Sequence, residues 1–227
     1  MLNKVTFTGI DNYCKTKELI ELQKEYPFVE YGILVSHMHT NKRTEKRYPD
    51  LVMLKGLKRE NLNLSIHICG KAAREIITKN SFTLFNELTK DYLPMFQRIQ
   101  LNISGTKNCI PVAFDLSQEI IIQTKSDDIT TLEMLKLDNS NVVGFQDNSG
   151  GKGIAENIWL ESEDDYFGYA GGISPENVID CIKSIDEIRN KPYWIDMESN
   201  IRTNDKFDIT KCRSICELII ENKLIKL

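Results

Sequence analysis

The chain has 227 residues, a formal net charge of −4 and 41% hydrophobic residues. This length fits one α/β domain of ordinary size, so we predict a single domain over residues 1–227. The small negative charge gives no electrostatic reason to expect nucleic acid or an anionic membrane as a partner. The longest apolar stretches are too short to span a bilayer, and the first residues enter a strand pattern without a signal-peptide core, so we expect a cytoplasmic protein.

Six cysteines are scattered along the chain, and none form a CxxC pair. No histidine is spaced to complete a zinc site with them, and a pair at His37 and His39 has no third ligand in view. We therefore predict no metal, no cofactor, and reduced, buried thiols. Cys212 and Cys216 lie one helical turn apart, which indicates one face of the last helix.

Short apolar runs alternate with helical patterns along the whole chain. Eight such units indicate a βαβ series, because parallel strands that are buried on both faces are nearly continuously apolar. An open doubly wound sheet usually has fewer strands, so we predict an α/β fold of the closed (β/α)8, or TIM, barrel type. The predicted strands are Val5–Thr8, Val29–Val35, Leu64–Ile68, Ile99–Ile103, Glu119–Gln123, Val142–Gln146, Tyr166–Ala170 and Tyr193–Met197.

Helical periodicity follows the first, third, fifth, seventh and eighth predicted strands, at residues 19–26, 71–79, 130–137, 177–188 and 209–221. Residues 104–117 show no helical period, so we expect an irregular link after the fourth strand. The basic run at residues 41–50 is predicted to be a long loop after the second strand, on the face where barrels carry their active sites.

The run YAGGISPENV predicts an anion site at the end of the seventh strand. Gly171 and Gly172 make the turn, with Ser174 expected as the helix N-cap and Pro175 as the first helical residue. Paired glycines let the backbone approach an anion, and a helix N-terminus supplies donors. A plain tight turn is the alternative, but Ser199 and Asn200 follow the eighth strand, where the second half of a barrel phosphate site belongs.

The order of motifs resembles phosphoribosylanthranilate isomerase, a (β/α)8 enzyme of tryptophan biosynthesis. That family has a Lys-hydrophobic-Cys-Gly-Ile-Thr start, a Ser-Pro-Arg-Tyr-like element, Gln-Leu-His-Gly and an Asp before Gly-Gly-x-Gly-Lys. It then has Gly-Gly-Leu-x-Pro-x-Asn-Val and Val-Asp-Val-Ser-Ser-Gly-Val-Glu. In this chain the corresponding segments, in the same order, are VTFTGID, EKRYP, IQLNIS, GFQDNSGGKGI, AGGISPENV and WIDMESNIR.

The resemblance implies roles for individual residues. Arg47 would meet an aromatic carboxylate, because a guanidinium binds a carboxylate with two parallel hydrogen bonds. Asp147 would be the general acid that opens the ribose ring, although an Asp that caps the following loop is the alternative. The residues implied to hold a substrate phosphate are Gly171, Gly172, Ser199 and Asn200.

The chain departs from the family pattern at five of these positions. Thr8 stands where the family has its catalytic cysteine, and Asn102 replaces the strand-four histidine. Ile154, Asn200 and Arg202 replace Lys, Gly and Glu, respectively. A threonine hydroxyl cannot take a proton at neutral pH unless another base activates it. We therefore predict that phosphoribosylanthranilate isomerase activity is absent or very weak.

Two replacement bases are proposed from the sequence. His67 lies near the end of the third strand and could titrate near physiological pH, or it could be a hydrogen-bonded barrel histidine. Glu198 ends the eighth strand and would point to the mouth if Asp196 points inward. Cys69 shares the strand face of His67, with simple packing as its alternative. Asp11, after the first strand, is expected to serve the first helix.

Three functional hypotheses remain open at this point. The protein is an isomerase-like enzyme acting on a phosphorylated sugar conjugate, a barrel of the same descent with other chemistry on a phosphorylated metabolite, or a binding protein that kept the phosphate site and lost catalysis. In each case the expected partner is a small phosphorylated metabolite, and the expected state is a monomer or homodimer. Likeness of fold cannot decide among the three.

Overall fold

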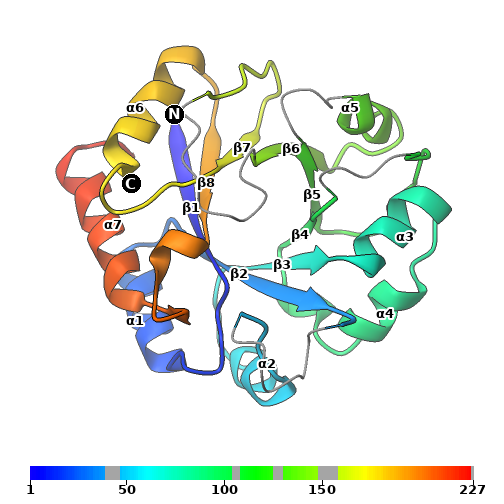
Figure 1. Ribbon diagram of the computed structural model, residues 1–227, viewed down its shortest axis with the longest axis horizontal. Helices are drawn as coiled ribbons and strands as arrows, with labels where there is room; N and C mark the ends of the chain where they lie inside the picture. The colour runs from blue at the N-terminus through cyan, green and yellow to red at the C-terminus, as the bar shows by residue number, and fades with distance from the viewer. Residues whose placement is uncertain (39–46, 104–107, 125–129, 148–157, 226–227) are drawn as a thin grey trace.

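The computed structural model describes residues 1–38, 47–103, 108–124, 130–147 and 158–225. Its eight parallel strands form a closed barrel in the order β1 to β8, which confirms the predicted (β/α)8 fold (Figure 1). The strands are β1 (Leu2–Thr8), β2 (Val29–Ser36), β3 (Leu64–Cys69), β4 (Arg98–Leu101), β5 (Glu119–Thr124), β6 (Val142–Asp147), β7 (Phe167–Ala170) and β8 (Tyr193–Met197).

The barrel closes where β1 pairs with β8, in a parallel register that places Val5 beside Ile195 and Phe7 beside Met197. In Figure 1 these two strands, blue and orange, lie side by side. β1 begins at Leu2, three residues before the predicted start, because Leu2 pairs with Tyr193 and also bridges to Ile225 near the end of the chain. The first strand is thus held at both of its sides.

Helices surround the barrel (Figure 1). Two of them, α3 and α7, have the predicted bounds, and the described part of the link between β4 and β5 contains no helix, as expected. None of the helices in the described ranges is long and apolar enough to cross a membrane. The helices are α1 (Thr16–Glu25), α2 (Leu51–Leu57), α3 (Lys71–Lys79), α4 (Thr83–Thr89), α5 (Thr130–Lys136), α6 (Val178–Ile188) and α7 (Ile209–Glu221), with short 3-10 turns η1 (Leu93–Met95) and η2 (Ser199–Ile201).

The last helix shows why these segments fold against the barrel. Cys212, Ile215, Cys216 and Ile219 are fully buried, and their spacing of three and four residues puts them on one face of α7. Cys212 and Cys216 are thiols, as predicted. Cys14, Cys69 and Cys109 are only partly buried, so the expectation of buried thiols holds for half of the cysteines.

The start of α6 differs from the prediction. The helix begins at Val178, with Asn177 as its N-cap residue, and Pro175 lies in the turn before it. Ser174 nevertheless accepts two hydrogen bonds at this turn. Its Oγ accepts from the Glu176 amide at 3.3 Å, and its carbonyl oxygen accepts from the Val178 amide at 3.0 Å. The Ser-Pro pair therefore initiates a turn that leads into the helix.

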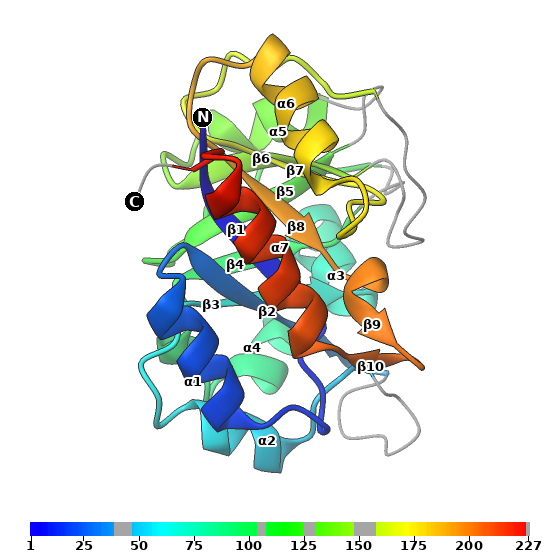
Figure 2. The same cartoon turned by 90° about the vertical axis from the view of Figure 1, so that its left-hand side faces the viewer.

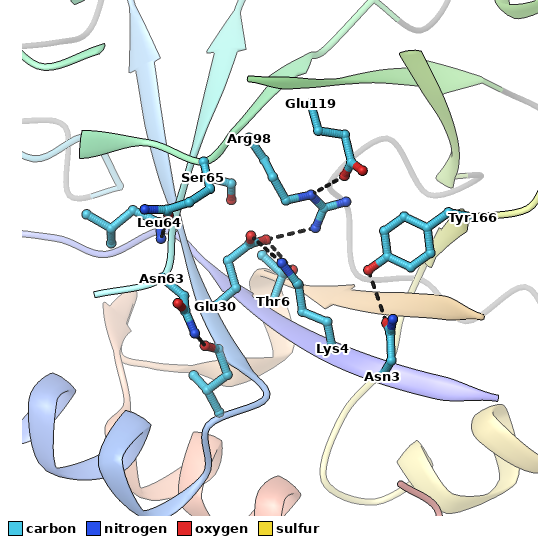
Figure 3. Close-up of polar contacts among 12 residues, drawn as sticks. Asn3, Lys4, Thr6, Glu30, Asn63, Leu64, Ser65, Arg98, Glu119 and Tyr166 are labelled. Carbon is cyan, nitrogen blue, oxygen red and sulfur yellow. Dashed lines mark hydrogen bonds and ion pairs between the residues drawn. The ribbon is translucent and has the colours of Figure 1, made fainter. Parts of the chain in front are cut away.

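Charged side chains fill the amino-terminal end of the barrel (Figure 3). Arg98, the first residue of β4, donates from Nη1 to Glu30 Oε1 at 3.0 Å and from Nε to Glu119 Oε1 at 2.6 Å. Its guanidinium lies 4.0 Å from the ring centroid of Trp194. Glu30 also accepts bonds from Lys4 Nζ at 3.2 Å and Thr6 Oγ1 at 2.9 Å. This network closes one end of the barrel, so any opening lies at the other end.

A short hairpin that the sequence did not indicate follows β8. It pairs β9 (Arg202–Thr203) with β10 (Lys206–Phe207) in antiparallel fashion. The two turn residues, Asn204 and Asp205, have φ values of 52° and 58°, as expected for a two-residue turn of the hairpin type. Figure 2 shows this hairpin at the opposite end of the barrel from the N-terminus.

Candidate functional site

A cavity of about 350 Å³ opens at the carboxyl ends of the barrel strands, and all eight strands contribute to its lining. Because side chains alternate along a strand, every second residue faces the barrel interior. All eight residues proposed from the sequence line this one cavity, although they come from distant parts of the chain. They are Arg47, His67, Asp147, Gly171, Gly172, Glu198, Ser199 and Asn200.

Asp196 is a cavity residue that the sequence analysis did not select. Its Oδ1 accepts a hydrogen bond of 2.7 Å from Thr8 Oγ1, which joins β8 to β1 at the mouth. A Cβ on Gly32 would lie 2.2 Å from Thr8 Oγ1, so only glycine fits beside this pair. Glu198, predicted as the end of the eighth strand, lies one residue beyond β8 at the start of η2. The signal that could have revealed Asp196 is its place just before the last residue of β8, at the carboxyl end where barrels carry their sites.

Burial raises the pKa of Asp196 well above its usual value, and the nearby carboxyls of Glu198 and Asp147 raise it further. The hydrogen bond from Thr8 opposes this effect. A carboxyl with a raised pKa is a stronger base once ionised and can hold a proton at a higher pH than ordinary aspartate. The cavity therefore contains a group suited to moving a proton.

This raised pKa gives a testable effect on stability. The folded protein keeps a proton on Asp196 that the unfolded chain loses above its pKa of 3.8, so stability falls as the pH rises from 3.8 toward the folded pKa. Asp196→Asn keeps a hydrogen-bond acceptor for Thr8 and removes this loss. We expect the variant to exceed wild type in urea stability by more at about pH 8 than at about pH 5.

The matched control is Asp165→Asn, since Asp165 is fully exposed and should not change the difference between the two pH values. A difference in stability between Asp196→Asn and wild type that is the same at both pH values would contradict a carboxyl that resists ionisation in the folded state.

Asp147 ends β6 and is buried at the edge of the cavity. Gln123 Nε2, from the neighbouring strand β5, donates a hydrogen bond of 2.9 Å to its Oδ2. This bond fixes the direction of the carboxyl. The following segment and Ile154 lie outside the described residues.

His67 and Cys69 both line the cavity from β3, so they do share a strand face. Burial lowers the pKa of His67 to about 3, and its Nε2 lies 3.1 Å from Ser65 Oγ. The imidazole is therefore neutral at physiological pH and a weak base. Burial raises the pKa of Cys69 to about 11, and Asn102 Nδ2 lies 3.2 Å from its sulfur. Asn102, the departure at strand four, thus contacts a protonated thiol.

Arg47 is bound by carboxylates of the chain itself. Its Nη1 lies 2.6 Å from Glu198 Oε1, and its Nε lies 3.3 Å from Asp205 Oδ1. Nη1 also donates to Ser199 Oγ at 3.2 Å. Burial raises the pKa of Glu198, and the charge of Arg47 opposes that rise. The guanidinium that the resemblance assigns to a substrate carboxylate therefore already has two carboxylate partners.

Arg202 ties the loops after β1 and β8 together. Its Nη2 donates to Asp11 Oδ2 at 2.6 Å and its Nη1 to the Gly9 carbonyl at 2.7 Å. Asp11 is fully buried and also accepts from the Phe207 amide at 2.8 Å. The expectation that Asp11 serves the first helix is wrong, because α1 begins at Thr16 with Lys15 as its N-cap residue, and the Asp11 carboxyl holds the hairpin instead. This ion pair with Asp11 gives the arginine at position 202, where the family pattern has glutamate, a structural role.

The two turns proposed to hold phosphate are joined by a side chain. Gly171 and Gly172 have φ values of 127° and 66°, which favour glycine. Asn200 Nδ2 donates to the Gly172 carbonyl at 3.0 Å, and Asn177 Nδ2 donates to the same oxygen at 3.0 Å. The amide side chain of Asn200 therefore links η2 to the glycine turn, and both turns border the cavity.

His37 is exposed at the end of β2, and His39 lies outside the described residues. Within the described ranges, no three His, Cys, Asp or Glu side chains are grouped so that they could hold a metal ion.

An eight-stranded parallel barrel with a polar cavity at the carboxyl ends of its strands defines a (β/α)8 protein of the kind that carries its site on the βα loops. The family model of N-(5'-phosphoribosyl)anthranilate (PRA) isomerase matches residues 99–218, just over half of the chain. The chain belongs to this family. No curated protein sequence matches the chain significantly.

Solved structures of similar fold are themselves phosphoribosyl anthranilate isomerases. The enzyme from Thermus thermophilus is 11% identical with a TM-score of 0.55, over 96% of this chain and 99% of that one. The enzyme from Thermococcus kodakaraensis is 16% identical with a TM-score of 0.51, over 97% and 99%. A third, 13% identical with a TM-score of 0.50 over 96% and 97%, is a complex with reduced 1-(o-carboxyphenylamino)-1-deoxyribulose 5-phosphate. At these identities the likeness shows the fold.

Proposed function

We propose that the protein is an isomerase-related enzyme that binds a phosphorylated sugar-type metabolite and moves a proton within it. The observation that carries this proposal is the gathering of Asp147, Asp196 and Glu198 in one cavity with the glycine turn of Gly171 and Gly172. Carboxyls that converge in one cavity are a usual means of general acid–base catalysis. Membership of the PRA isomerase family supports the same class of reaction.

The phosphate would bind between the glycine turn and the turn that contains Ser199 and Asn200. Both turns border the cavity, and Asn200 holds them together through the Gly172 carbonyl. Glycine in this position leaves the backbone open to close approach by an anion. The solved relative that carries a deoxyribulose 5-phosphate derivative shows that a barrel of this fold accommodates such an ester.

Asp147 would act as the general acid, since Gln123 directs its carboxyl at the edge of the cavity. The base in this proposal is the ionised form of Asp196, which Thr8 positions by its 2.7 Å hydrogen bond and whose raised pKa makes it a stronger base than an ordinary aspartate once its proton has left. His67 remains part of the site as a neutral hydrogen-bonding group, because a pKa of about 3 makes it a weak base. Glu198 remains a second acid or base at the mouth, with its charge partly offset by Arg47.

A second candidate function is a binding protein without catalysis on the same scaffold. The observation that favours it is the engagement of Thr8 and Arg47 by carboxyls of the chain, where the family pattern has a catalytic base and a substrate ligand. Both candidates require the phosphate site, so a test of that site bears on each. If Asp147→Asn loses turnover but still binds phosphate, the protein is an enzyme and not a binding protein without catalysis.

The proposed phosphate site predicts where inorganic phosphate binds and how a substitution there changes the affinity for it. We expect inorganic phosphate in a soaked crystal to lie between the turns of Gly171–Gly172 and Ser199–Asn200. Asn200→Asp places a negative charge there, and like charges at roughly 4 Å repel by several kcal/mol near a protein surface. We therefore expect calorimetry to show phosphate affinity reduced at least about tenfold.

Asn190→Asp is the matched control, because Asn190 is an exposed residue in the loop before β8, at the other end of the barrel. It should bind phosphate like wild type. Strong anion density elsewhere, or unchanged affinity in Asn200→Asp, would refute the proposed phosphate site and with it both candidate functions.

A further inference from the structure

The charges around the cavity are unbalanced. Among the described residues that line it, Arg47 is the side chain with a full positive charge, whereas the lining has three carboxyls, those of Asp147 and Glu198 and that of Asp196, which resists ionisation. His67 is neutral at physiological pH. A ligand that already carries a phosphate therefore meets three carboxyls and neutral polar groups, but no cation besides Arg47, on the described wall of the cavity.

The single guanidinium in this lining is already committed. Arg47 uses different nitrogens to bind Glu198 at 2.6 Å and Asp205 at 3.3 Å, and it donates to Ser199 as well. Glu198 is 22% exposed and Arg47 36%, so water covers neither group fully. An incoming carboxylate would have to displace Glu198 and leave that carboxylate partly buried without its cation, which is costly.

The partners of Arg47 are themselves held in place. The buried Arg202 donates from Nη2 to the Asp205 carbonyl at 2.8 Å, and its Nε lies 3.5 Å from Asp205 Oδ1. Arg202 is fixed in turn by Asp11. At Gly9, whose φ is 92°, an added Cβ would lie 3.0 Å from Arg202 Nη1 and 3.5 Å from Glu198 Cγ, so the backbone leaves little room beside both side chains. The carboxylates that face Arg47 are thus part of a network anchored in two loops.

Resting on the proposed phosphate-dependent function, we propose that Glu198 is a specificity-determining residue that excludes ligands with a carboxylate. The substrate class that fits is an amino sugar phosphate, with its phosphate on the glycine turn and its ammonium group among the cavity carboxyls. An ammonium group can donate three hydrogen bonds and needs no displacement of Glu198 from Arg47. A hydroxyl in the same place is tolerated, and a carboxylate is rejected.

Three commercial six-carbon phosphate esters separate these cases: glucosamine 6-phosphate, glucose 6-phosphate and 6-phosphogluconate carry an ammonium, a hydroxyl and a carboxylate, respectively. Each is titrated by calorimetry into the full-length protein, alone and in competition with inorganic phosphate. We expect wild type to bind glucosamine 6-phosphate at least about tenfold more tightly than 6-phosphogluconate, with glucose 6-phosphate between them.

Glu198→Gln tests the residue itself, because it keeps the shape of the side chain and removes its charge. Arg47 would then keep Asp205 as its carboxylate partner, and the affinity for 6-phosphogluconate should rise at least about tenfold relative to that for glucosamine 6-phosphate. Glu161→Gln removes the same charge from an exposed residue that lines a separate cavity, away from the mouth, and should leave the ranking of the three ligands unchanged.

Two outcomes would overturn the inference. One is 6-phosphogluconate binding to wild type as tightly as glucosamine 6-phosphate, and the other is a ranking that Glu198→Gln does not alter. In both of these outcomes inorganic phosphate still binds and competes, so the proposed function survives. Failure of inorganic phosphate and of all three esters to bind any variant would instead refute the proposed function.

Discussion

Glu30→Gln is expected to lower the free energy of unfolding by about 3–5 kcal/mol, because it leaves the buried guanidinium of Arg98 without its buried counter-charge. Glu30 and Arg98 are only 1% and 3% exposed, so water cannot replace the lost partner. Burial alone would raise the pKa of Glu30, but the charges of Arg98 and Lys4 bring it below its usual value. The carboxylate is therefore ionised and stabilising throughout the neutral range.

Urea denaturation of wild type and variant measures this loss. Glu119→Gln is the matched control, since Glu119 also bonds Arg98 but is 31% exposed, and we expect it to cost about 1 kcal/mol or less. Because the pKa of Glu30 is lowered in the folded state, its contribution begins to fall at about pH 4.5 and is lost as the pH drops through the lower folded pKa, so the difference between wild type and Glu30→Gln should shrink on acidification. If the two variants lose the same free energy of unfolding, the buried Glu30–Arg98 pair stabilises the protein no more than the more exposed Glu119–Arg98 pair does.

Turnover of phosphoribosylanthranilate by the wild-type protein is expected to be absent, or slower by ~10²–10⁴-fold than with a positioned base in place of Thr8. The Thr8 hydroxyl is hydrogen-bonded to Asp196 and is itself no base. Steady-state fluorescence or absorbance assays with the purified protein would measure this rate. Turnover at an ordinary enzyme rate would contradict the prediction.

Thr8→Cys should restore part of that activity by returning a titratable group to the end of β1. Arg47 forms an ion pair with Glu198. The double variant Thr8→Cys, Glu198→Gln should therefore gain more turnover than Thr8→Cys alone, because one carboxylate fewer then competes with the substrate carboxylate for the guanidinium. Adding Asp147→Asn to the double variant is the control. Loss of the gained activity would locate it in this cavity, and its persistence would assign it to another site.

The barrel was predictable from the sequence because eight short apolar runs alternate with helical segments along the chain. Runs such as YWIDM are short, largely apolar and bounded by turns, and β8 has the predicted bounds. Segments with few residues or mixed patterns were not predictable. The β9–β10 hairpin has strands of two residues, too short for any period, and the Ser-Pro pair of Ser174 and Pro175 indicates a helix start that lies three residues further on.

The residues of the candidate site were predictable where a local motif or a strand end marked them, as at Gly171, Gly172 and Asp147. Their pairings were not, because they join positions far apart in the chain. Nothing in the residues around Arg47 indicates that Glu198, 151 positions later, will bind it. The role of Asp196 was not predictable for a related reason, since its partner Thr8 lies 188 positions earlier. The low proton affinity of His67 follows from burial, which a strand pattern does not measure.

The bonds that shape the mouth of the cavity set the order in which the molecule can be assembled. Thr8 to Asp196, Gly9 and Asp11 to Arg202, and Asp11 to Phe207 each join groups 188 to 196 residues apart. Contacts of such separation carry a large loop-closure cost and form late. During synthesis from the N-terminus, the first strand must remain unpaired on one side until β8 emerges. A fragment ending before Tyr193 would lack Asp196, Glu198 and Arg202, and would expose β1 as an open edge, where chaperone binding or aggregation is favoured.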